Sequence, residues 1–277
     1  MQVKHLPDAV RFSRMTTAEL REEFLLKNLF KAGEIAMVYI HLDRAIVGSA
    51  VPTDKILMPE ISKKELAADF LLQRREIGII NIGASGKVIA DSVGYPMENR
   101  DCVYLGMGTR EIGFASDDPL NPAQFYLLSY PAHAKYPNAT MRFADATSVK
   151  LGNQSEANCR TLHKYIFQQG IKSCQLVMGL TELNDGSVWN TMPAHTHERR
   201  SEIYLYFNVK NPSIVCHLMG KPDETRHIIM RDKQVVISPS WSIHSAAGTH
   251  AYSFIWGMGG ENQDFDDMDG VEMDQLR

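Results

Sequence analysis

Many short apolar segments, separated by turn residues, constrain the fold of this 277-residue chain most strongly. β-Branched and aromatic residues gather in runs that Gly, Pro, Asn and Asp interrupt, a pattern typical of short strands. The runs are AMVYIHL, AIVGSAV, IGIINIG, KVIADSV, CVYLGM, EIGFAS and QFYLLSY in the first half, and CQLVMGLTEL, SEIYLYFNV, SIVCHLM, HIIMRD, QVVISP and YSFIWGM in the second. Such spacing predicts a mainly β fold, either a sandwich or a barrel.

One short helix is predicted near the N-terminus. Thr16 and Glu19 have the spacing of a capping box, in which each side chain bonds the backbone of the other residue. The apolar residues that follow at helical spacing are Leu20, Phe24, Leu25 and Leu29. We expect this helix to end near Gly33.

The two halves of the chain resemble each other, which predicts two similar β-domains. In both halves a pair of arginines and a glutamate precede an alternating apolar strand. The matching segments are LLQRREIGIINIG (71–83) with THERRSEIYLYFNV (196–209), and RDCVYLGMGTREI (100–112) with KQVVISPSWSIHS (233–245). We predict an N-terminal domain over 1–145 and a C-terminal domain over 146–277, joined within the turn-rich stretch 132–158.

Composition excludes several classes of protein. The net charge is −4 and the basic residues are scattered, so nucleic acid is not an expected partner. The first fifteen residues contain no apolar leader, and the chain has no run of eighteen apolar residues. We therefore expect a cytoplasmic protein that neither spans nor binds a membrane. The four cysteines form no CxxC pair, which indicates reduced thiols rather than a zinc knuckle.

The segment PAHTHERRSE (193–202) holds the strongest candidate for chemistry. His195 and His197 are two residues apart, so on a strand they point to one face with backbones roughly 6.6 Å apart. The pair alone is weak, because ten histidines in a chain of this length give about 0.36 such pairs by chance. Glu202 starts the next strand, and His244 follows a turn at the end of a strand predicted to pair alongside. These four residues are the candidate metal ligands.

The spacing of these four residues resembles the paired metal-binding motifs of the cupin superfamily. His195, His197 and Glu202 match the first motif, and Pro239 with His244 matches the second. Cupins bind a metal with three histidines and one glutamate on a small jelly roll. Two glycines of the usual motifs are replaced, by Val209 and Trp241, which affects the geometry of turns rather than the ligands.

A closer resemblance, to the 5-dehydro-4-deoxy-D-glucuronate isomerase family, covers nearly the whole chain. The segments that carry it are HLDRAIVG, RREIGIINIG, WNTMPAHTHERRSEIYLYFN, PDETRHIIM and ISPSWSIHSAAGTHAYSFIWGMGGENQDFDDMD. The resemblance implies a bicupin of two jelly-roll domains, commonly a hexamer, with one Zn²⁺ per subunit. It also implies a ketol-isomerase that converts 5-dehydro-4-deoxy-D-glucuronate to 3-deoxy-D-glycero-2,5-hexodiulosonate. Such enzymes act in the breakdown of unsaturated uronates from pectin or glycosaminoglycans.

The internal repeat predicts that only the second half binds metal. Glu76 corresponds to Glu202 in the alignment of the two halves. Asp69 and Leu71 then stand where the second half has its first two histidines, and Glu111 stands at about the position of the third. We interpret the first half as a degenerate cupin that supports packing, oligomerisation or one wall of the site.

The base and the substrate contacts are less constrained by spacing. Glu198, Glu261 or a metal-bound hydroxide could remove the proton that a ketol isomerisation transfers. Arg199 is the nearest candidate by strand alternation for the substrate carboxylate. Arg226 is an alternative.

Three further residues near the motif have both a functional and a structural interpretation. Arg200 is another candidate for the carboxylate, but an arginine pair also precedes the strand of the first half, which favours a structural role for Arg199 and Arg200. Trp241 could form a sugar-binding wall, as could Trp256, although aromatic residues inside β-sandwiches more often belong to the core.

Three other functions compete with the leading one. The first is the 5-deoxyglucuronate isomerase of inositol catabolism, whose histidine motif is related to PAHTHE. The second is an iron-dependent cupin dioxygenase, and the third is a sugar-binding cupin without catalytic activity. All three would use the same pocket and a small-molecule ligand.

Overall fold

The computed structural model describes residues 1–61 and 63–277, which form two compact units. Unit 1 comprises residues 1–4, 28–147 and 165–177, and unit 2 comprises residues 5–27, 148–164 and 178–277. The principal change from one unit to the other, after residue 147, lies close to the expected boundary at 145. Neither unit is continuous in sequence, because residues 5–27 belong to unit 2 and residues 165–177 to unit 1.

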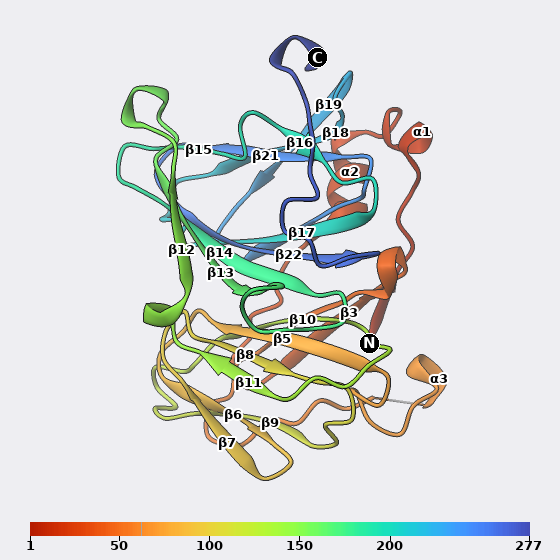
Figure 1. Ribbon diagram of the computed structural model, residues 1–277, viewed down its shortest axis with the longest axis vertical. Coiled ribbons are helices and arrows are strands. Elements are labelled where there is room, and N and C mark those ends of the chain that lie inside the picture. Colours follow the sequence, from red (N-terminus) through yellow and green to blue (C-terminus); the bar gives the residue numbers. More distant parts are fainter. Residues whose placement is uncertain (62) are drawn as a thin grey trace. The chain divides into compact units, whose positions relative to one another are not determined.

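Unit 1 is built from two sheets (Figure 1). In spatial order, the larger sheet contains β1 (Gln2–Lys4), β3 (Ile35–Ile40), β4 (Ile46–Ala50), β10 (Phe125–Pro131), β5 (Arg75–Asn81), β8 (Cys102–Leu105) and β11 (Ala139–Met141). The smaller sheet contains β7 (Val93–Met97), β6 (Gly86–Ala90) and β9 (Ile112–Ser116). A single helical turn, α3 (Lys63–Leu66), precedes β5. Buried apolar side chains of both sheets, among them Ile79, Val103, Val88 and Phe114, form one core cluster.

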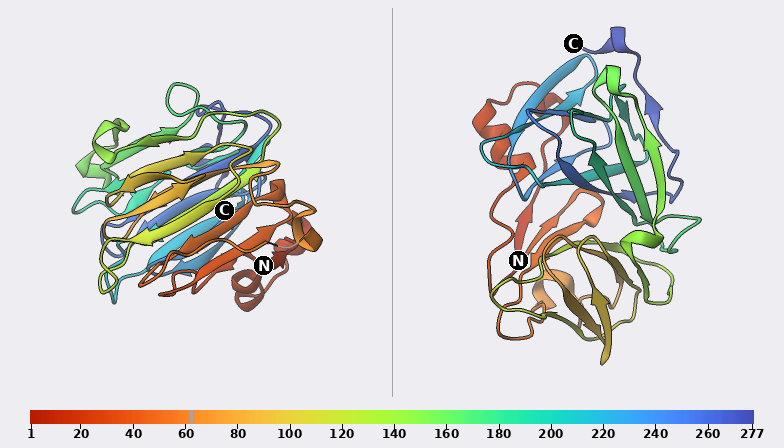
Figure 2. Two further views of the ribbon diagram at one scale, coloured as in Figure 1. Left: turned by 90° about the horizontal axis from the view of Figure 1, so that it is seen from below. Right: turned by 90° about the vertical axis from the view of Figure 1, so that its left-hand side faces the viewer.

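Unit 2 contains a larger sheet, a smaller sheet and a short pair of strands. The larger sheet is ordered β12 (Thr147–Leu151), β13 (Arg160–Ile166), β14 (Val177–Leu183), β22 (Ser253–Gly260), β17 (Arg200–Phe207), β20 (Gln234–Ser238) and β2 (Leu25–Leu26). The smaller sheet is ordered β15 (Trp189–Asn190), β21 (Ile243–Gly248), β18 (Val215–Lys221) and β19 (Glu224–Met230). The short pair is β16 (His195–Thr196) with β23 (Asp269–Gly270). Figure 2 shows these strands from two further directions.

The predicted N-terminal helix is present but shorter than expected. After the single turn α1 (Ala9–Phe12), α2 runs from Thr17 to Phe24, and the capping box of Thr16 with Glu19 is confirmed. The helix does not continue toward Gly33, because Leu25 and Leu26 form β2 and pair with β20. Their apolar side chains are buried, so strand pairing here overrides the helical spacing of the leucines.

The predicted mainly β fold is confirmed. Each apolar run identified in the sequence contributes a strand, as in β5, β10, β17 and β22. In the described part of the chain, no helix has the length and apolar character needed to cross a membrane. All four cysteines are free thiols.

Strand alternation in unit 2 sorts side chains onto the inner face of the larger sheet. All eight residues of β17 are buried, so both of its faces are covered. Glu202 and Tyr204 lie on one face, since they are two residues apart, and they pair with Met258 and Trp256 of β22. Directly paired residues share a face, so this register places a carboxylate, a phenol and an indole side by side.

Candidate metal centre

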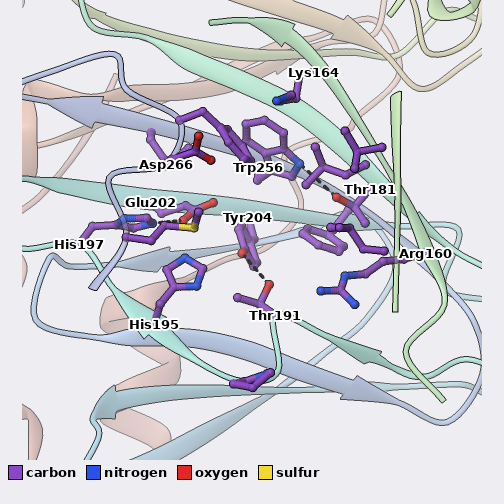
Figure 3. A pocket seen from close by; sticks show the side chains of 18 residues that line it. Arg160, Lys164, Thr181, Thr191, His195, His197, Glu202, Tyr204, Trp256 and Asp266 are labelled. Carbon is purple, nitrogen blue, oxygen red and sulfur yellow. Dashed lines mark hydrogen bonds and ion pairs between the residues drawn. The ribbon is translucent and has the colours of Figure 1, made fainter. Parts of the chain in front are cut away.

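A cavity of about 420 Å³ lies inside unit 2. Its volume is in the range of small-molecule sites. The residues that line it are Val149, Leu151, Arg160, Leu162, Lys164, Thr181, Thr191, Pro193, His195, His197, Glu202, Tyr204, Phe254, Trp256, Met258, Phe265, Asp266 and Met268. Figure 3 shows their side chains.

Most of the wall is the inner face of the larger sheet. On β13 every second residue lines the cavity, namely Arg160, Leu162 and Lys164, and on β22 Phe254, Trp256 and Met258 do the same. This period of two is the signature of one strand face. The sheet is mostly apolar, and its polar groups therefore stand out as the candidates for binding and chemistry.

The structure brings His195, His197, Glu202 and His244 together. One potential ligand atom of each lies within 4.8 Å of those of the other three. Glu202 Oε2 lies 2.8 Å from His197 Nε2 and 2.9 Å from His244 Nε2, and the Nε2 atoms of His195 and His244 are 2.9 Å apart. His195 is supplied by β16, Glu202 by β17 and His244 by β21, while His197 follows β16. The cluster therefore depends on three separate strands.

Burial and hydrogen bonding prepare these side chains to be ligands. Burial, with a further contribution from the charge of His244, lowers the pKa of His195 to about 2, so its imidazole is neutral. Although burial opposes ionisation of Glu202, its close contacts with His244 and His197 hold its pKa well below the usual range. The cluster thus combines an ionised carboxylate with a neutral imidazole.

The orientation of His197 fits a metal. Its Nδ1 lies 2.7 Å from the carbonyl oxygen of Asp267, so Nδ1–H donates to that oxygen. In a neutral ring this leaves a lone pair on Nε2, which faces the carboxylate of Glu202. Two acceptors at this distance require a proton or a cation between them. Three imidazole nitrogens and one carboxylate oxygen are a suitable donor set for a divalent transition metal.

Two arginines hold the segment that supplies this carbonyl. Arg200 is only 1% exposed and donates to the carbonyl oxygens of Asp264, Phe265 and Asp267. Arg199 forms ion pairs with Asp267 and Asp269. Both arginines are therefore part of the support of His197, which is a structural role beside the metal cluster.

Of the other candidate site residues, Trp256 lines the cavity, whereas five further side chains lie elsewhere. Glu198 and Glu261 are exposed and do not line it. Arg199 is engaged with the two aspartates described above, and Arg226 donates to the carbonyl oxygens of Ser13 and Met15. Trp241 packs edge-on against Phe12. Two of these five side chains are thus exposed to solvent, and the other three contact residues outside the cavity wall.

The cavity contains polar residues that the sequence reasoning missed. Arg160 and Lys164 lie on β13, a strand that was not predicted because its residues are mainly polar. Asp266 lies in an acidic segment that the sequence analysis did not connect with the site. Tyr204 contacts Thr191 through the two hydroxyl oxygens, 3.3 Å apart. Leu162 is the one apolar residue of the stretch 160–164, so the alternation of apolar and polar residues that marks a strand is missing here.

Thr191 adopts an unusual backbone conformation. Its φ is 50°, in the left-handed region that β-branched residues rarely enter. Its carbonyl oxygen accepts a hydrogen bond from the Ser245 hydroxyl, and its own hydroxyl faces Tyr204. These contacts hold the Thr191 side chain at the cavity wall.

In unit 1 the residue that corresponds to Glu202 has different partners. The Glu76 carboxylate accepts hydrogen bonds from the backbone N–H groups of Cys174, Gln175 and Leu176 and from the Tyr104 hydroxyl. With four donors, this buried carboxylate serves to fix the chain segment at 174–176.

The other positions of unit 1 that align with ligands contribute no histidine. Asp69 is exposed and pairs with Lys63, while Leu71 belongs to the apolar core. Glu111 is exposed. The only group of potential metal ligands found among the described residues is the one in unit 2.

Comparison with known proteins gives consistent results over the full chain. The sequence model of the KduI/IolB family matches residues 24–273. A protein of Caldicellulosiruptor bescii named 4-deoxy-L-threo-5-hexosulose-uronate ketol-isomerase is 51% identical over 277 residues, covering 100% of both chains. A protein of the same name from Lachnoclostridium phytofermentans is 55% identical over 262 residues, covering 95% of both chains.

Solved structures agree on the fold. An IolB-like protein from Salmonella typhimurium has a TM-score of 0.71 at 14% identity and covers 90% of this chain and 96% of its own. An oxalate decarboxylase has a TM-score of 0.58 at 10% identity, covering 86% of this chain and 77% of its own. At such identities the likeness concerns the fold alone, and the predicted bicupin fold is confirmed.

Proposed function

The chain belongs to the KduI/IolB family, and from this premise we propose that it catalyses the ketol isomerisation of 4-deoxy-L-threo-5-hexosulose uronate. The observation that carries the proposal is the identity of about half of all residues, over the full length, to proteins of that name. The product is 3-deoxy-D-glycero-2,5-hexodiulosonate. The substrate is the same compound that is called 5-dehydro-4-deoxy-D-glucuronate.

The reaction moves hydrogen between two adjacent carbons. C1 of the substrate is an aldehyde and C2 carries a hydroxyl group. In the product, with the substrate's numbering kept, C1 is a hydroxymethyl group and C2 a ketone. A base must therefore remove the proton from C2 and return it to C1, while a hydroxyl proton passes from the C2 oxygen to the C1 oxygen. Negative charge develops on oxygen during this transfer and must be stabilised.

We assign the metal to His195, His197, Glu202 and His244, one ion per chain. When bound, it supplies Lewis-acid stabilisation of the developing negative charge. Zinc is the proposed metal, because the reaction needs no change of oxidation state and because imidazole nitrogens and carboxylate oxygens are ligands that zinc accepts. The convergence of the four ligand atoms supports the choice of these residues.

Asp266 is the proposed base. Glu202 and Asp266 are the carboxylates that line the cavity, and Glu202 is engaged by two imidazoles. Asp266 is exposed on the cavity side of the segment that Arg200 holds, so it is free to approach C2. Tyr204 and Thr191 present hydroxyl groups that can bind the substrate oxygens.

The remaining parts of the proposal rest on the family resemblance. They are a homo-oligomer, taken as a hexamer, and a cytoplasmic location in a pathway of uronate breakdown. The ligand is a small uronate, and no nucleic acid or membrane partner is expected.

The competing function is 5-deoxyglucuronate isomerisation, because the motif PAHTHE also resembles the histidine motif of that enzyme of inositol catabolism. The sequence identities favour the hexosulose-uronate substrate. Turnover of the two substrates by one preparation separates these functions, and ligand binding without turnover of either would indicate a non-catalytic sugar-binding protein. Oxygen consumption with bound iron would indicate a dioxygenase.

The decisive experiment is incubation of zinc-reconstituted protein with 4-deoxy-L-threo-5-hexosulose uronate, followed by NMR identification of the product. We expect His195→Ala to abolish turnover. His227→Ala is the matched control, because His227 is an exposed histidine of β19 outside the cluster. No turnover by the zinc-loaded wild-type protein refutes the proposed function.

A further inference from the structure

The distribution of charge in the cavity is asymmetric. Glu202 and Asp266 lie at the end that holds the histidines, and Arg160 lies at the opposite end, with Tyr204 between them (Figure 3). A substrate with two different ends would therefore meet two different environments. The question is which end of a uronate each environment fits.

Arg160 has the contacts expected of a guanidinium group that binds an anionic ligand. Its Nη1 donates to the carbonyl oxygen of Asn158 at 2.8 Å, which fixes one edge of the guanidinium. Among the described residues, no carboxylate forms an ion pair with it. The side chain is half-buried, and burial lowers its pKa, which means that the charge is partly stripped of water. An anion within the cavity would offset that cost.

Lys164, the other cation on this strand face, is placed differently. Its Nζ lies 4.6 Å from the centre of the Phe265 ring, so it is engaged with the segment that carries Asp266. Four residues separate it from Arg160, roughly 13 Å along a strand. Because Phe265 is the residue next to Asp266, a carboxylate bound at Lys164 would be repelled by the charge of that aspartate.

From these observations we infer that the Arg160 guanidinium binds the substrate carboxylate and so sets which end of the uronate reaches the metal centre. This inference rests on the proposed function for the identity of the substrate. Guanidinium groups bind carboxylates through two parallel hydrogen bonds, which gives direction as well as affinity.

The dimensions of the substrate agree with this placement. The reacting carbons C1 and C2 lie at one end of a six-carbon chain and the carboxylate at the other. In an extended chain with bonds of ~1.5 Å, the carboxyl carbon lies roughly 5 Å from C2. The step from Glu202 to Tyr204 on β17 covers roughly 6.6 Å in the same cavity. A uronate whose C1 and C2 lie at the histidines therefore places its carboxylate near the level of Tyr204, a residue close enough to Arg160 to influence its pKa.

The test compares a charged with a neutral ligand in wild type and in Arg160→Gln and Arg160→Lys. The kinetic pair is the uronate and its methyl ester, and the binding pair is D-galacturonate and D-galactose, measured by calorimetry. We expect Arg160→Gln to lower kcat/KM for the uronate about 100-fold, mainly through KM, and for the ester less than threefold. Arg160→Lys keeps the charge but not the planar group, so its kcat/KM for the uronate should lie between those of wild type and Arg160→Gln. Lys150→Gln is the control, because Lys150 is an exposed cation of β12 between two cavity-lining residues.

The outcomes separate this inference from the proposed function. Equal losses for the ester and the uronate in both Arg160 variants would show a structural role and overturn the inference, as would a loss of selectivity in Lys164→Gln but not in Arg160→Gln. Failure of wild type to prefer galacturonate over galactose also overturns it. If wild type prefers galacturonate through Arg160 but does not isomerise the uronate, the role of Arg160 in carboxylate binding is supported and the proposed reaction is wrong.

Discussion

Replacement of Glu202 by glutamine tests the metal centre most directly. The carboxylate is 5% exposed and makes two charge-assisted contacts, with the Nε2 atoms of His197 and His244. A contact to a charged group contributes about 1.5–3 kcal/mol, and on metal binding the carboxylate exchanges its contacts with the two imidazoles for one with the ion. Glutamine keeps the shape but removes the charge, so at the upper value for the contact with the ion the loss is about 3 kcal/mol. That corresponds to roughly a 100-fold weaker affinity for zinc.

The assay is competition for zinc against a chromophoric chelator, with the metal content checked by elemental analysis. Glu198→Gln is the matched control, because it removes the same charge from an exposed position four residues away. Its zinc affinity should stay within threefold of wild type. The reasoning is refuted if Glu202→Gln binds zinc as tightly as wild type, or if both variants lose affinity equally.

Three further predictions concern the surroundings of the metal. Asp266→Asn should lower kcat by about 100-fold or more with little change in KM or zinc content, as expected for loss of a general base. The control is Asp274→Asn, at an exposed position outside the cavity, whose kcat should equal that of wild type. A normal kcat for Asp266→Asn would show that Asp266 is not the base. Arg200→Met leaves three carbonyl oxygens without their buried donor, so the free energy of unfolding of the metal-free protein should fall by about 3–5 kcal/mol. Calorimetry should show this as a Tm lower by several degrees. An unchanged Tm would contradict the structural role of Arg200. The pKa of Asp267 is lowered to about 2, and the hydrogen bond from Arg199 is the largest cause. In the unfolded chain the pKa of this carboxyl is about 4. The ion pair therefore stabilises the fold fully above pH ~4 and loses its effect as the pH falls toward 2. The Tm difference between wild type and Arg199→Met should therefore shrink over that range, and a difference independent of pH would argue against the ion pair.

The strands and the metal cluster were the parts most accessible from sequence. Alternating apolar runs such as those of β5, β17 and β22 are local signals, because burial of one strand face is recorded at every second position. The capping box at Thr16 is local in the same sense. The four candidate ligands were recognisable because His195, His197 and Glu202 share one motif, and the resemblance to cupins connects them with His244.

Pairing between strands distant in the sequence determined where the helix ends and which polar segment forms a strand. The helix ends at Phe24 because Leu25 and Leu26 find a partner in β20, more than two hundred residues away. The sequence of β13 is too polar to be recognised as a strand, yet its place in the larger sheet turns Arg160 toward the cavity.

The division between structural and functional arginines and acids was also decided in three dimensions. Arg199 and Arg200 lie beside the metal motif in sequence, but aspartates and backbone carbonyls of residues 264–269 bind them. Asp266 reaches the cavity because that same segment is held there. Sequence by itself thus determined the fold class and indicated four candidate ligands, since strand alternation and the spacing of His195, His197 and Glu202 are local patterns. The tertiary structure decided which charged groups face the substrate, because hydrogen-bond partners and burial depend on residues distant in the chain.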